Sequence, residues 1–271
     1  MDVAGIIVGD EVLSGHVVDE NGPRLAREIQ DAGHRLRRLA VVADETATIA
    51  REIRLALEDG CGIVVTSGGL GPTHDDVTLE GVAEGLGVPL AECLPMRERI
   101  DGWIVRATTI GISEEQLGAA WLRRMAQAPA GAELLECSIP VPAFAIPAGE
   151  AIVCVLPGPP AQFAAALADA VLPRLGDPGA TVVEEVRHPF PESMLAQVLA
   201  DLAEMYRDVS IGSYPLTEGV LLRVKGPAEA VGAVATALRE TIATLESSEQ
   251  ARALLEAAAE RRRATSTPRG S

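Results

Sequence analysis

A glycine-rich loop followed by two aspartates carries the residue types that hold a phosphorylated ligand. The segment reads Ser67-Gly68-Gly69-Leu70-Gly71-Pro72-Thr73-His74-Asp75-Asp76-Val77-Thr78. Glycines adopt positive φ angles and let backbone amides approach a ligand closely. A helix predicted to begin near Val77 adds unpaired N–H groups and the positive end of its dipole. Asp75 and Asp76 would repel a bare phosphate, so the segment predicts a divalent cation between these carboxylates and a diphosphate.

Carboxylates also follow two other predicted strands. Asp10 and Glu11 come after an apolar run over residues 3–8, and Asp44 comes after a strand predicted over residues 35–43. Ligands of open parallel sheets bind beyond the carboxyl ends of the strands. We therefore expect these carboxylates and the glycine-rich loop to meet at one edge of a sheet.

These positions define one predicted site. The expected metal ligands are Asp44, Asp75 and Asp76, and the expected catalytic residues are Asp76, Asp10 and Glu11. Either Asp10 or Glu11 would orient a metal-bound water, which the metal makes acidic enough to attack phosphorus near neutral pH. The expected phosphate-binding residues are Ser67, Gly68, Gly69, Gly71, Thr73, Thr78 and Gly158. The expected cofactor is Mg²⁺, Mn²⁺ or Co²⁺, with K⁺ as a further candidate.

Each of these residues also has a purely structural alternative. A pair of aspartates before a helix commonly caps it, which contributes about 1 kcal/mol, and Asp10 and Asp44 are also typical turn residues. His74 is expected to be an exposed loop histidine rather than a catalytic one. Taken singly, the residues favour the structural alternatives, but their meeting at one sheet edge favours a site. The loop is not a phosphate-binding GxxxxGK[ST] motif, and Pro72 disrupts a dinucleotide fingerprint.

The order of the predicted elements indicates a mostly parallel sheet covered by helices on both faces. Strands predicted over residues 3–8, 35–43 and 63–66 alternate with helices over 20–32, 46–59 and 77–86. The middle of the chain predicts helices over 92–107 and 114–127, short strands over 133–147 and a buried strand over 152–156. A capping box of Ser113 and Gln116 is expected to open the second of these helices.

Two domains and a tail are predicted. Residues 1–175 form a three-layer α/β/α domain that ends in an alanine-rich helix to about residue 174, and residues 176–246 form a small α+β domain. The small domain is expected to contain strands over 181–187, 209–213 and 219–225 and helices over 192–206 and 228–245. Residues 247–271 are predicted to be a flexible tail, in which Arg261, Arg262 and Arg263 are solvated.

The composition argues against several classes of protein. The 271 residues include 23 Lys and Arg against 39 Asp and Glu, for a net charge of −16, so we expect no nucleic-acid partner. No apolar run approaches the ~18 residues of a membrane span, and the N-terminus lacks the basic start of a signal peptide. We therefore expect a soluble, cytoplasmic protein without a membrane partner. The four cysteines do not have the spacing of a metal site. They are expected to be reduced thiols, at Cys61, Cys93, Cys137 and Cys154.

Several motifs make the sequence resemble a known family. The run Gly9-Asp10-Glu11-Val12-Leu13-Ser14-Gly15, with Asp19 and Asn21, resembles the opening of the molybdopterin-binding-like domain. The run from Ser67 to Glu80 resembles the glycine signature of that domain. Three later segments are similar to the N-terminal region of the competence/damage-inducible protein A (CinA) family, namely Leu156–Pro160, Pro191–Ser193 and Ile211–Pro215. The resemblance spans about residues 3–240.

The resemblance implies a fold and an activity. The fold is a three-layer α/β domain shared with molybdopterin adenylyltransferases and molybdotransferases, followed by a small α+β domain. The activity is metal-dependent hydrolysis of ADP-ribose and related nucleotide diphosphates, by a homo-oligomer that we expect to be a dimer or trimer. By position, Asp76 and Asp44 match two acidic site positions, and the ligand-cradling turn is matched by Gly68, Gly69 and Gly71. Full-length relatives carry a further nicotinamide-mononucleotide deamidase domain, and because this sequence ends before one, we expect no deamidase activity.

Two departures from the family pattern bear on turnover. Residues 136–144 lack the asparagine and the glycines of a second loop, and Gln162 stands where the family has an acid. If that loop and acid close over the diphosphate, turnover is reduced or lost. The alternative to a hydrolase is therefore a non-catalytic molybdopterin- or nucleotide-binding protein that serves transfer or regulation. The third hypothesis is a molybdenum-cofactor enzyme proper. It ranks last because it does not account for the small C-terminal unit.

Overall fold

A computed structural model of the protein describes residues 1–139, 142–177, 179, 181–217, 219–251, 253 and 255. The chain divides into two compact units, Met1–Pro178 and Gly179–Ser271, whereas the sequence prediction divides it after residue 175. The predicted tail lies largely outside the described residues, including Arg261, Arg262 and Arg263. Among the helices of the described residues, none has both the length and the apolar composition that crossing a membrane requires.

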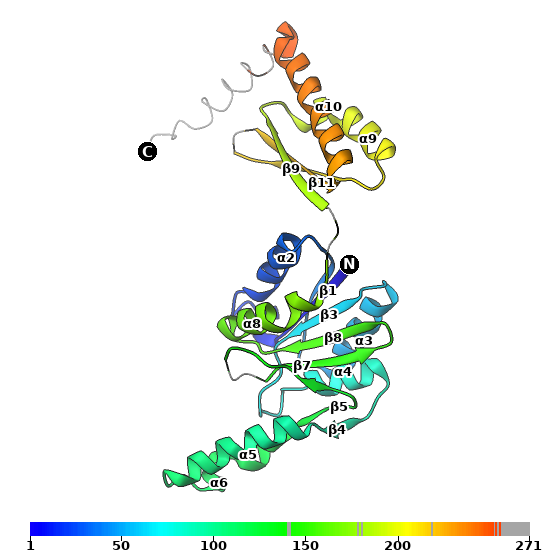
Figure 1. Cartoon of the computed structure of the whole chain (residues 1–271). Helices are drawn as coiled ribbons and strands as arrows, with labels where there is room; N and C mark the ends of the chain where they lie inside the picture. Colours follow the sequence, from blue (N-terminus) through cyan, green and yellow to red (C-terminus); the bar gives the residue numbers. More distant parts are fainter. Residues whose placement is uncertain are drawn as a thin grey trace, which may run out of the picture. The chain divides into compact units, whose positions relative to one another are not determined.

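The first unit is built on a mixed, mostly parallel sheet (Figure 1). Its six strands run in the order β2 (Arg35–Val42), β1 (Asp2–Val8), β3 (Ile63–Ser67), β8 (Ala151–Leu156), β7 (Phe144–Ala148) and β6 (Glu133–Leu134). β2, β1, β3 and β8 pair in parallel, and β7 and β6 are antiparallel additions. Consequently β1, β3 and β8 all end at the same edge of the sheet.

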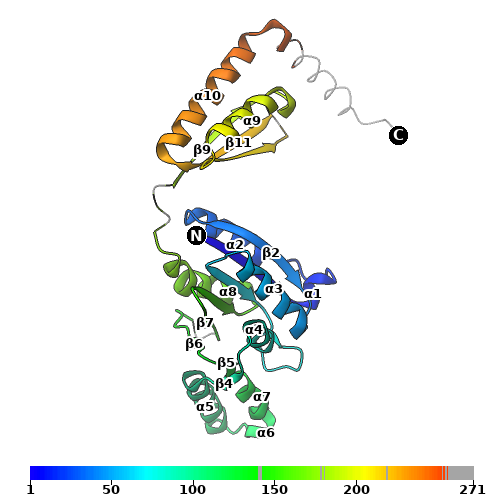
Figure 2. The same ribbon diagram turned by 90° about the vertical axis from the view of Figure 1, so that its right-hand side faces the viewer.

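Helices cover both faces of this sheet because successive strand residues point to opposite sides. On one face, Ala4, Ile6 and Val8 of β1 belong to a core with α3 (Thr46–Glu58) and α4 (Thr78–Leu86). On the other face, Val3 belongs to a core with α2 (Asn21–Asp31) and α8 (Pro160–Ala166). Figures 1 and 2 show the two helical layers on either side of the sheet, which confirms the predicted three-layer α/β/α domain.

A helical extension lies at the β7–β6 side of the first unit (Figure 2). It contains α5 (Leu94–Thr109), α6 (Glu114–Leu117), α7 (Ala119–Arg124) and a short antiparallel pair, β4 (Leu90–Glu92) with β5 (Gln127–Pro129), that was not predicted. The capping box is confirmed, since Ser113 and Gln116 each accept a hydrogen bond from the other's backbone N–H. The prediction of one helix over 114–127 is wrong, because Gly118 is left-handed at φ 65° and separates α6 from α7.

Two other predicted helices are shorter in the structure. The alanine-rich helix ends as α8 at Ala166 and continues as a π turn over Leu167–Val171 and a 3₁₀ turn over Leu172–Arg174. Pro173 lies in that last turn, where it lacks the N–H that an α-helix needs. In the second unit, Glu192–Met194 form a separate 3₁₀ turn before α9 (Ala196–Met205) rather than the start of one helix.

The second unit is a small α+β fold with its own core, as predicted. Its antiparallel sheet runs in the order β10 (Ser210–Pro215), β11 (Val220–Pro227) and β9 (Thr181–His188). The long helix α10 (Ala228–Ser247) packs its apolar side on this sheet. Leu222 and Val224 of β11 are fully buried in that core, together with Val231 and Leu238 of α10.

Candidate functional site

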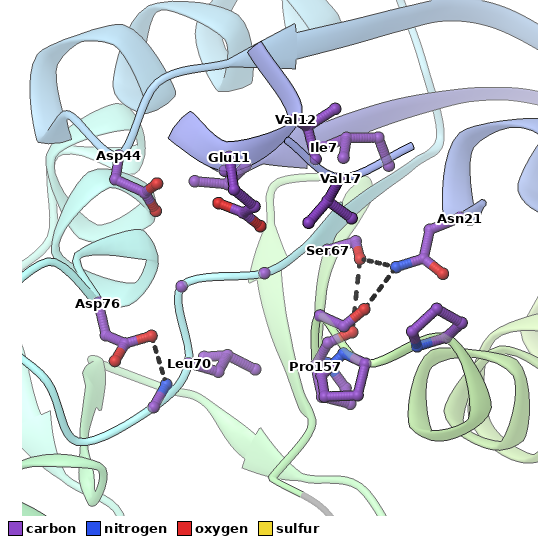
Figure 3. A pocket seen from close by; sticks show the side chains of 18 of the residues that line it. Ile7, Glu11, Val12, Val17, Asn21, Asp44, Ser67, Leu70, Asp76 and Pro157 are labelled. Atoms are coloured by element: carbon purple, nitrogen blue, oxygen red, sulfur yellow. Dashed lines mark hydrogen bonds between the residues drawn. The ribbon is translucent and has the colours of Figure 1, made fainter. Parts of the chain in front are cut away.

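A pocket of about 570 Å³ lies at the edge of the first sheet where β1, β3 and β8 end (Figure 3). Each strand continues into a loop that lines it, through Gly9 after β1, Gly68 after β3 and Gly158 after β8. Figure 3 shows the carboxylates of Glu11, Asp44 and Asp76 on one side of the pocket and Asn21 with Ser67 on the other. The carboxyl ends of the parallel strands therefore border this pocket, as the sequence predicts.

The glycine-rich loop packs so tightly that side chains would not fit. Gly68 has a φ of 103°, and a Cβ there would lie 2.2 Å from the carbonyl oxygen of Val8. A Cβ on Gly158 would lie 3.3 Å from the Cα of Gly68, so the loops after β3 and β8 are in direct contact. The Gly68 N–H donates to the Leu156 carbonyl at 3.2 Å. Among the described residues, the amides of Gly69 and Leu70 have no acceptor, so both remain available to a ligand.

Asp76 shapes this loop. Its carboxylate accepts hydrogen bonds from the Gly71 N–H at 2.7 Å, from the Thr73 N–H at 2.9 Å and from the Thr73 hydroxyl. The alternative that the aspartates cap α4 is wrong, because the residue before this helix is Val77 and no side chain caps it. Asp76 therefore braces the turn that presents the free amides.

The carboxylates after β1 and β2 form a reciprocal pair. The Asp10 N–H donates to Asp44 Oδ2 at 2.8 Å, and the Asp44 N–H donates to Asp10 Oδ1 at 3.4 Å. Burial raises the pKa of Asp44, the Asp10 N–H opposes this, and the charges of Asp10, Glu11 and Asp75 raise it further. Asp44 thus lies at the centre of a group of negative charges beside the pocket.

The predicted metal ligands do not form a closed protein cage. Within the described residues, no set of three or more His, Cys, Asp or Glu side chains is arranged to hold a metal ion. Asp44, Asp75 and Asp76 nevertheless all line the same pocket. Mg²⁺-like ions in phosphate sites are commonly held by one or two carboxylates, with phosphate oxygens and waters completing the shell. This donor set fits such an ion, with phosphate supplying the remaining ligands.

The structure separates the other predicted residues into two groups. Ser67, Gly68, Gly69, Gly71, Gly158 and Glu11 line the pocket. Asp10, Thr73 and Thr78 do not. Thr78 is fully buried and donates its hydroxyl to the Gly68 carbonyl at 2.9 Å, so it supports the loop from behind. His74, which follows Thr73 in the loop, has a side chain that is 88% exposed, as expected.

Sequence reasoning missed Asn21 as a site residue. Asn21 is 6% exposed, and its Nδ2 donates to Ser67 Oγ at 2.9 Å and to the Gly158 carbonyl at 2.7 Å (Figure 3). It therefore joins the start of α2 to the ends of β3 and β8. A signal was available, since Asn21 is the chain's one asparagine and directly follows the acidic loop after β1.

The two departures from the family pattern also border the pocket. Gln162 of α8 lines it, as does Pro142 of the changed 136–144 segment. Residues 140 and 141 of that segment lie outside the described residues. Gln162 places a neutral amide at the pocket wall where the family pattern has a carboxylate.

Residues 4–177 match the family described as "Probable molybdopterin binding domain". Protein PH0439 from Pyrococcus horikoshii is 34% identical over 211 residues, which cover 78% of this chain and 82% of that protein. The chain belongs to the molybdopterin-binding domain family. The matched range contains every residue of the pocket described above.

The similarity also reaches CinA-like members of the family. A CinA-like protein from Mycolicibacterium vanbaalenii is 36% identical over 215 residues, covering 76% of this chain and 50% of that protein. The chain thus spans about half the length of this relative. The crystal structure of CinA from Thermoplasma acidophilum is 30% identical with a TM-score of 0.53, covering 62% of this chain and 94% of that one. This chain is a CinA-like molybdopterin-binding domain protein.

Proposed function

We propose that this CinA-like protein is a divalent-metal-dependent hydrolase of a nucleotide diphosphate such as ADP-ribose. The observation that carries the proposal is the juxtaposition, in one pocket, of free loop amides at Gly69 and Leu70 with the carboxylates of Glu11 and Asp44. Amides aimed at a ligand favour phosphate oxygens, whereas the carboxylates favour a cation. A diphosphate with its metal ion satisfies both halves of the pocket.

The chain's residues then have separate roles. The amides of Gly69 and Leu70 hold phosphate oxygens, and Asp44 with Asp75 faces the cation. A bound divalent ion would neutralise phosphate charge and make a water acidic near neutral pH. Glu11 lines the pocket and Asp10 does not, so Glu11 is the residue that takes the proton from the attacking water. Water oxygen bonds to phosphorus as the bridging P–O bond breaks, and ADP-ribose yields AMP and ribose 5-phosphate.

A second candidate is binding of a nucleotide or molybdopterin without turnover. It is favoured by the neutral amide of Gln162 at the pocket wall and by the lack of a preformed set of three metal-binding side chains among the described residues. In this candidate the glycine loop retains the ligand, but nothing activates water. Assembly into a homo-oligomer is compatible with both candidates and is also a proposal.

AMP release from ADP-ribose separates the two candidates. We expect release with Mg²⁺, Mn²⁺ or Co²⁺ in the presence of K⁺, and a loss of at least about 100-fold in the Asp44→Asn variant, because general acid–base and metal-ligand groups contribute on this scale. Asp31→Asn, at the exposed end of α2, is the matched control and should retain full activity. Equal release in the two variants would reject the hydrolase site. No release, with ADP-ribose still raising Tm, would support the binding protein.

A further inference from the structure

A second pocket of about 310 Å³ lies beside the glycine loop. We call it the Trp121 pocket, and its lining residues are Pro72, Thr73, His74, Leu117, Gly118, Trp121 and Leu122. None of these residues carries a carboxylate, in contrast to the main pocket. Its volume is near the lower bound of about 300 Å³ for small-molecule sites. The Trp121 pocket therefore suits an uncharged, largely apolar group.

The two pockets have no lining residue in common, but different residues of the glycine loop line each of them. Gly71, Asp75 and Asp76 line the main pocket, while residues 72–74, which lie between them in the chain, line the Trp121 pocket. The glycine loop is thus the partition between the two. On the opposite side, Trp121 of α7 lines the second pocket and Met125, just after α7, lines the first. A ligand with its phosphates on the glycine loop has the Trp121 pocket immediately beside it.

Among the aromatic residues that the structure describes, Trp121 and Tyr214 are the exposed ones, and of these two only Trp121 lines this pocket. Phe144, Phe163 and Phe190 are at most 1% exposed, and Trp103 packs against the core. Trp121 is 49% exposed. Small-molecule sites are commonly concave and lined mainly by apolar and aromatic side chains. An indole at the wall of a cavity provides a flat surface on which a planar ring can stack.

The indole is held in place by α4 through Arg124. The Arg124 guanidinium lies 5.0 Å from the centre of the Trp121 ring, and it also pairs with Glu80 of α4 at 3.4 Å. A cation over one face of an indole stabilises that arrangement. The ring is therefore oriented before any ligand arrives, which lowers the entropic cost of stacking.

We propose that the Trp121 pocket binds the planar heteroaromatic ring of the ligand whose phosphates lie on the glycine loop, with that ring stacked on Trp121. The inference rests on the proposed function for the position of the phosphates. A purine base and a pterin share the required chemistry, which is a flat, uncharged, nitrogen-containing bicycle. The side chain of Trp121 supplies the stacking surface, and residues 72–74 supply the facing wall.

Ligand affinities test the subsite directly. We expect Trp121→Ala to weaken binding of AMP and of ADP-ribose by roughly tenfold or more, since stacking of a base on an aromatic side chain contributes about 1–3 kcal/mol. Trp121→Phe should retain most of the affinity. Ribose 5-phosphate has no heteroaromatic ring, so its affinity should be the same in the wild type and in Trp121→Ala. Equal weakening of all three ligands would overturn the subsite, because it would indicate a general distortion of the loop.

Tryptophan fluorescence supplies a second, independent readout. In a Trp103→Phe background Trp121 is the one remaining tryptophan, and its emission should be quenched saturably by AMP or by a pterin, but not by ribose 5-phosphate. Whichever of AMP and the pterin quenches at the lower concentration identifies the ring, purine or pterin, that the pocket prefers. Quenching that depends on protein concentration instead of on ligand would overturn the proposal in favour of a second copy of the chain as the occupant.

The outcomes also distinguish this inference from the proposed function. Quenching by AMP without any release of AMP from ADP-ribose would reject the hydrolase and support the subsite. Release of AMP with unchanged kinetics in Trp121→Ala would support the hydrolase and reject the subsite. The affinity comparison needs no Trp103 variant, so it decides the question even if Trp103→Phe fails to fold.

Discussion

At the scale of single residues, the pocket depends on Asn21 as much as on its acidic side chains. Asn21 holds Ser67 and the Gly158 carbonyl through one amide nitrogen, so the loops after β3 and β8 share a single donor. This donor is buried, where a lost hydrogen bond leaves its partners unsatisfied. Asn21 is therefore a positioning residue for the glycine loop.

Replacing Asn21 should affect stability and binding together. We expect Asn21→Ala to lower the free energy of unfolding by about 1–3 kcal/mol, because two acceptors lose their donor in a buried site, and to weaken nucleotide binding. Denaturant titration and ADP-ribose titration by calorimetry measure the two effects. Gln30→Ala, near the other end of α2, is the control and should change neither. Unaltered binding in Asn21→Ala would show that the strand-end loops keep their positions without this side chain.

Gly68 and Gly60 are two glycines with positive φ that differ in whether there is room for a side chain, and comparing their alanine variants tests how tightly the glycine loop is packed. Both have positive φ, 103° and 77°, but a Cβ on Gly68 would meet the Val8 carbonyl whereas nothing lies within 4 Å of one on Gly60. Gly60→Ala should therefore lower the free energy of unfolding by only about 1–2 kcal/mol, which is what a left-handed backbone costs a residue with a Cβ. Gly68→Ala should lower the free energy of unfolding by about 1–3 kcal/mol more, because the added methyl group overpacks the loop. Thermal unfolding of the two variants checks this, and equal losses would contradict the tight loop packing.

At the scale of elements, the end of β9 makes the small unit sensitive to acid. His188 is 4% exposed, and burial lowers its pKa below the ordinary 6.5. The unfolded chain therefore binds a proton at His188 at a higher pH than the folded chain does. Stability contributed by neutral His188 is fully present above about pH 6.5 and is lost as pH falls from 6.5 through the lowered pKa.

The second unit should accordingly unfold more easily at pH 5 than at pH 7. Each unit of pKa difference between the folded and unfolded states corresponds to about 1.4 kcal/mol. Urea titrations followed by NMR signals of the second unit would measure the change. His188→Gln removes the titrating group and should flatten this part of the pH profile. A profile unchanged in His188→Gln would assign the acid sensitivity to other groups.

At the scale of the whole molecule, each unit has its own hydrophobic core. The first unit has a core on each face of its sheet, and the second packs α10 on its three-stranded sheet. All residues lining the main pocket and the Trp121 pocket belong to the first unit. Ligand binding should therefore be a property of that unit.

Separate expression tests this division. We expect residues 1–177 alone to fold cooperatively, with a midpoint within a few degrees of the corresponding transition of the full chain, because domains with complete cores fold as units. The fragment should bind ADP-ribose with unchanged affinity. Circular dichroism and calorimetry measure the two properties. A fragment that folds but no longer binds would show that the second unit contributes to the site.

Local patterns in the sequence were sufficient for the frame of the first unit. Continuous apolar runs predicted the parallel strands, and apolar residues at helical spacing predicted the helices between them, because these features depend on near neighbours in the chain. The rule that ligands meet at strand ends then brought Glu11, Asp44 and the glycine loop to one pocket. The same reasoning failed at Gly118, which separates two short helices. The local sequence does not show whether a glycine adopts a left-handed conformation that ends a helix or continues within one helix.

The sequence by itself determined most of the elements, their order and the sheet edge at which the carboxylates and the glycine loop meet, because hydrophobic periodicity acts over a few residues. Only the tertiary structure decided which polar groups remain free. Asp76 turns inward to brace the loop, Asn21 donates to the Gly158 carbonyl 137 residues further along the chain, and Trp121 lies beside the glycine loop. These relations depend on contacts between distant segments, and packing and burial across the whole sheet edge determine them.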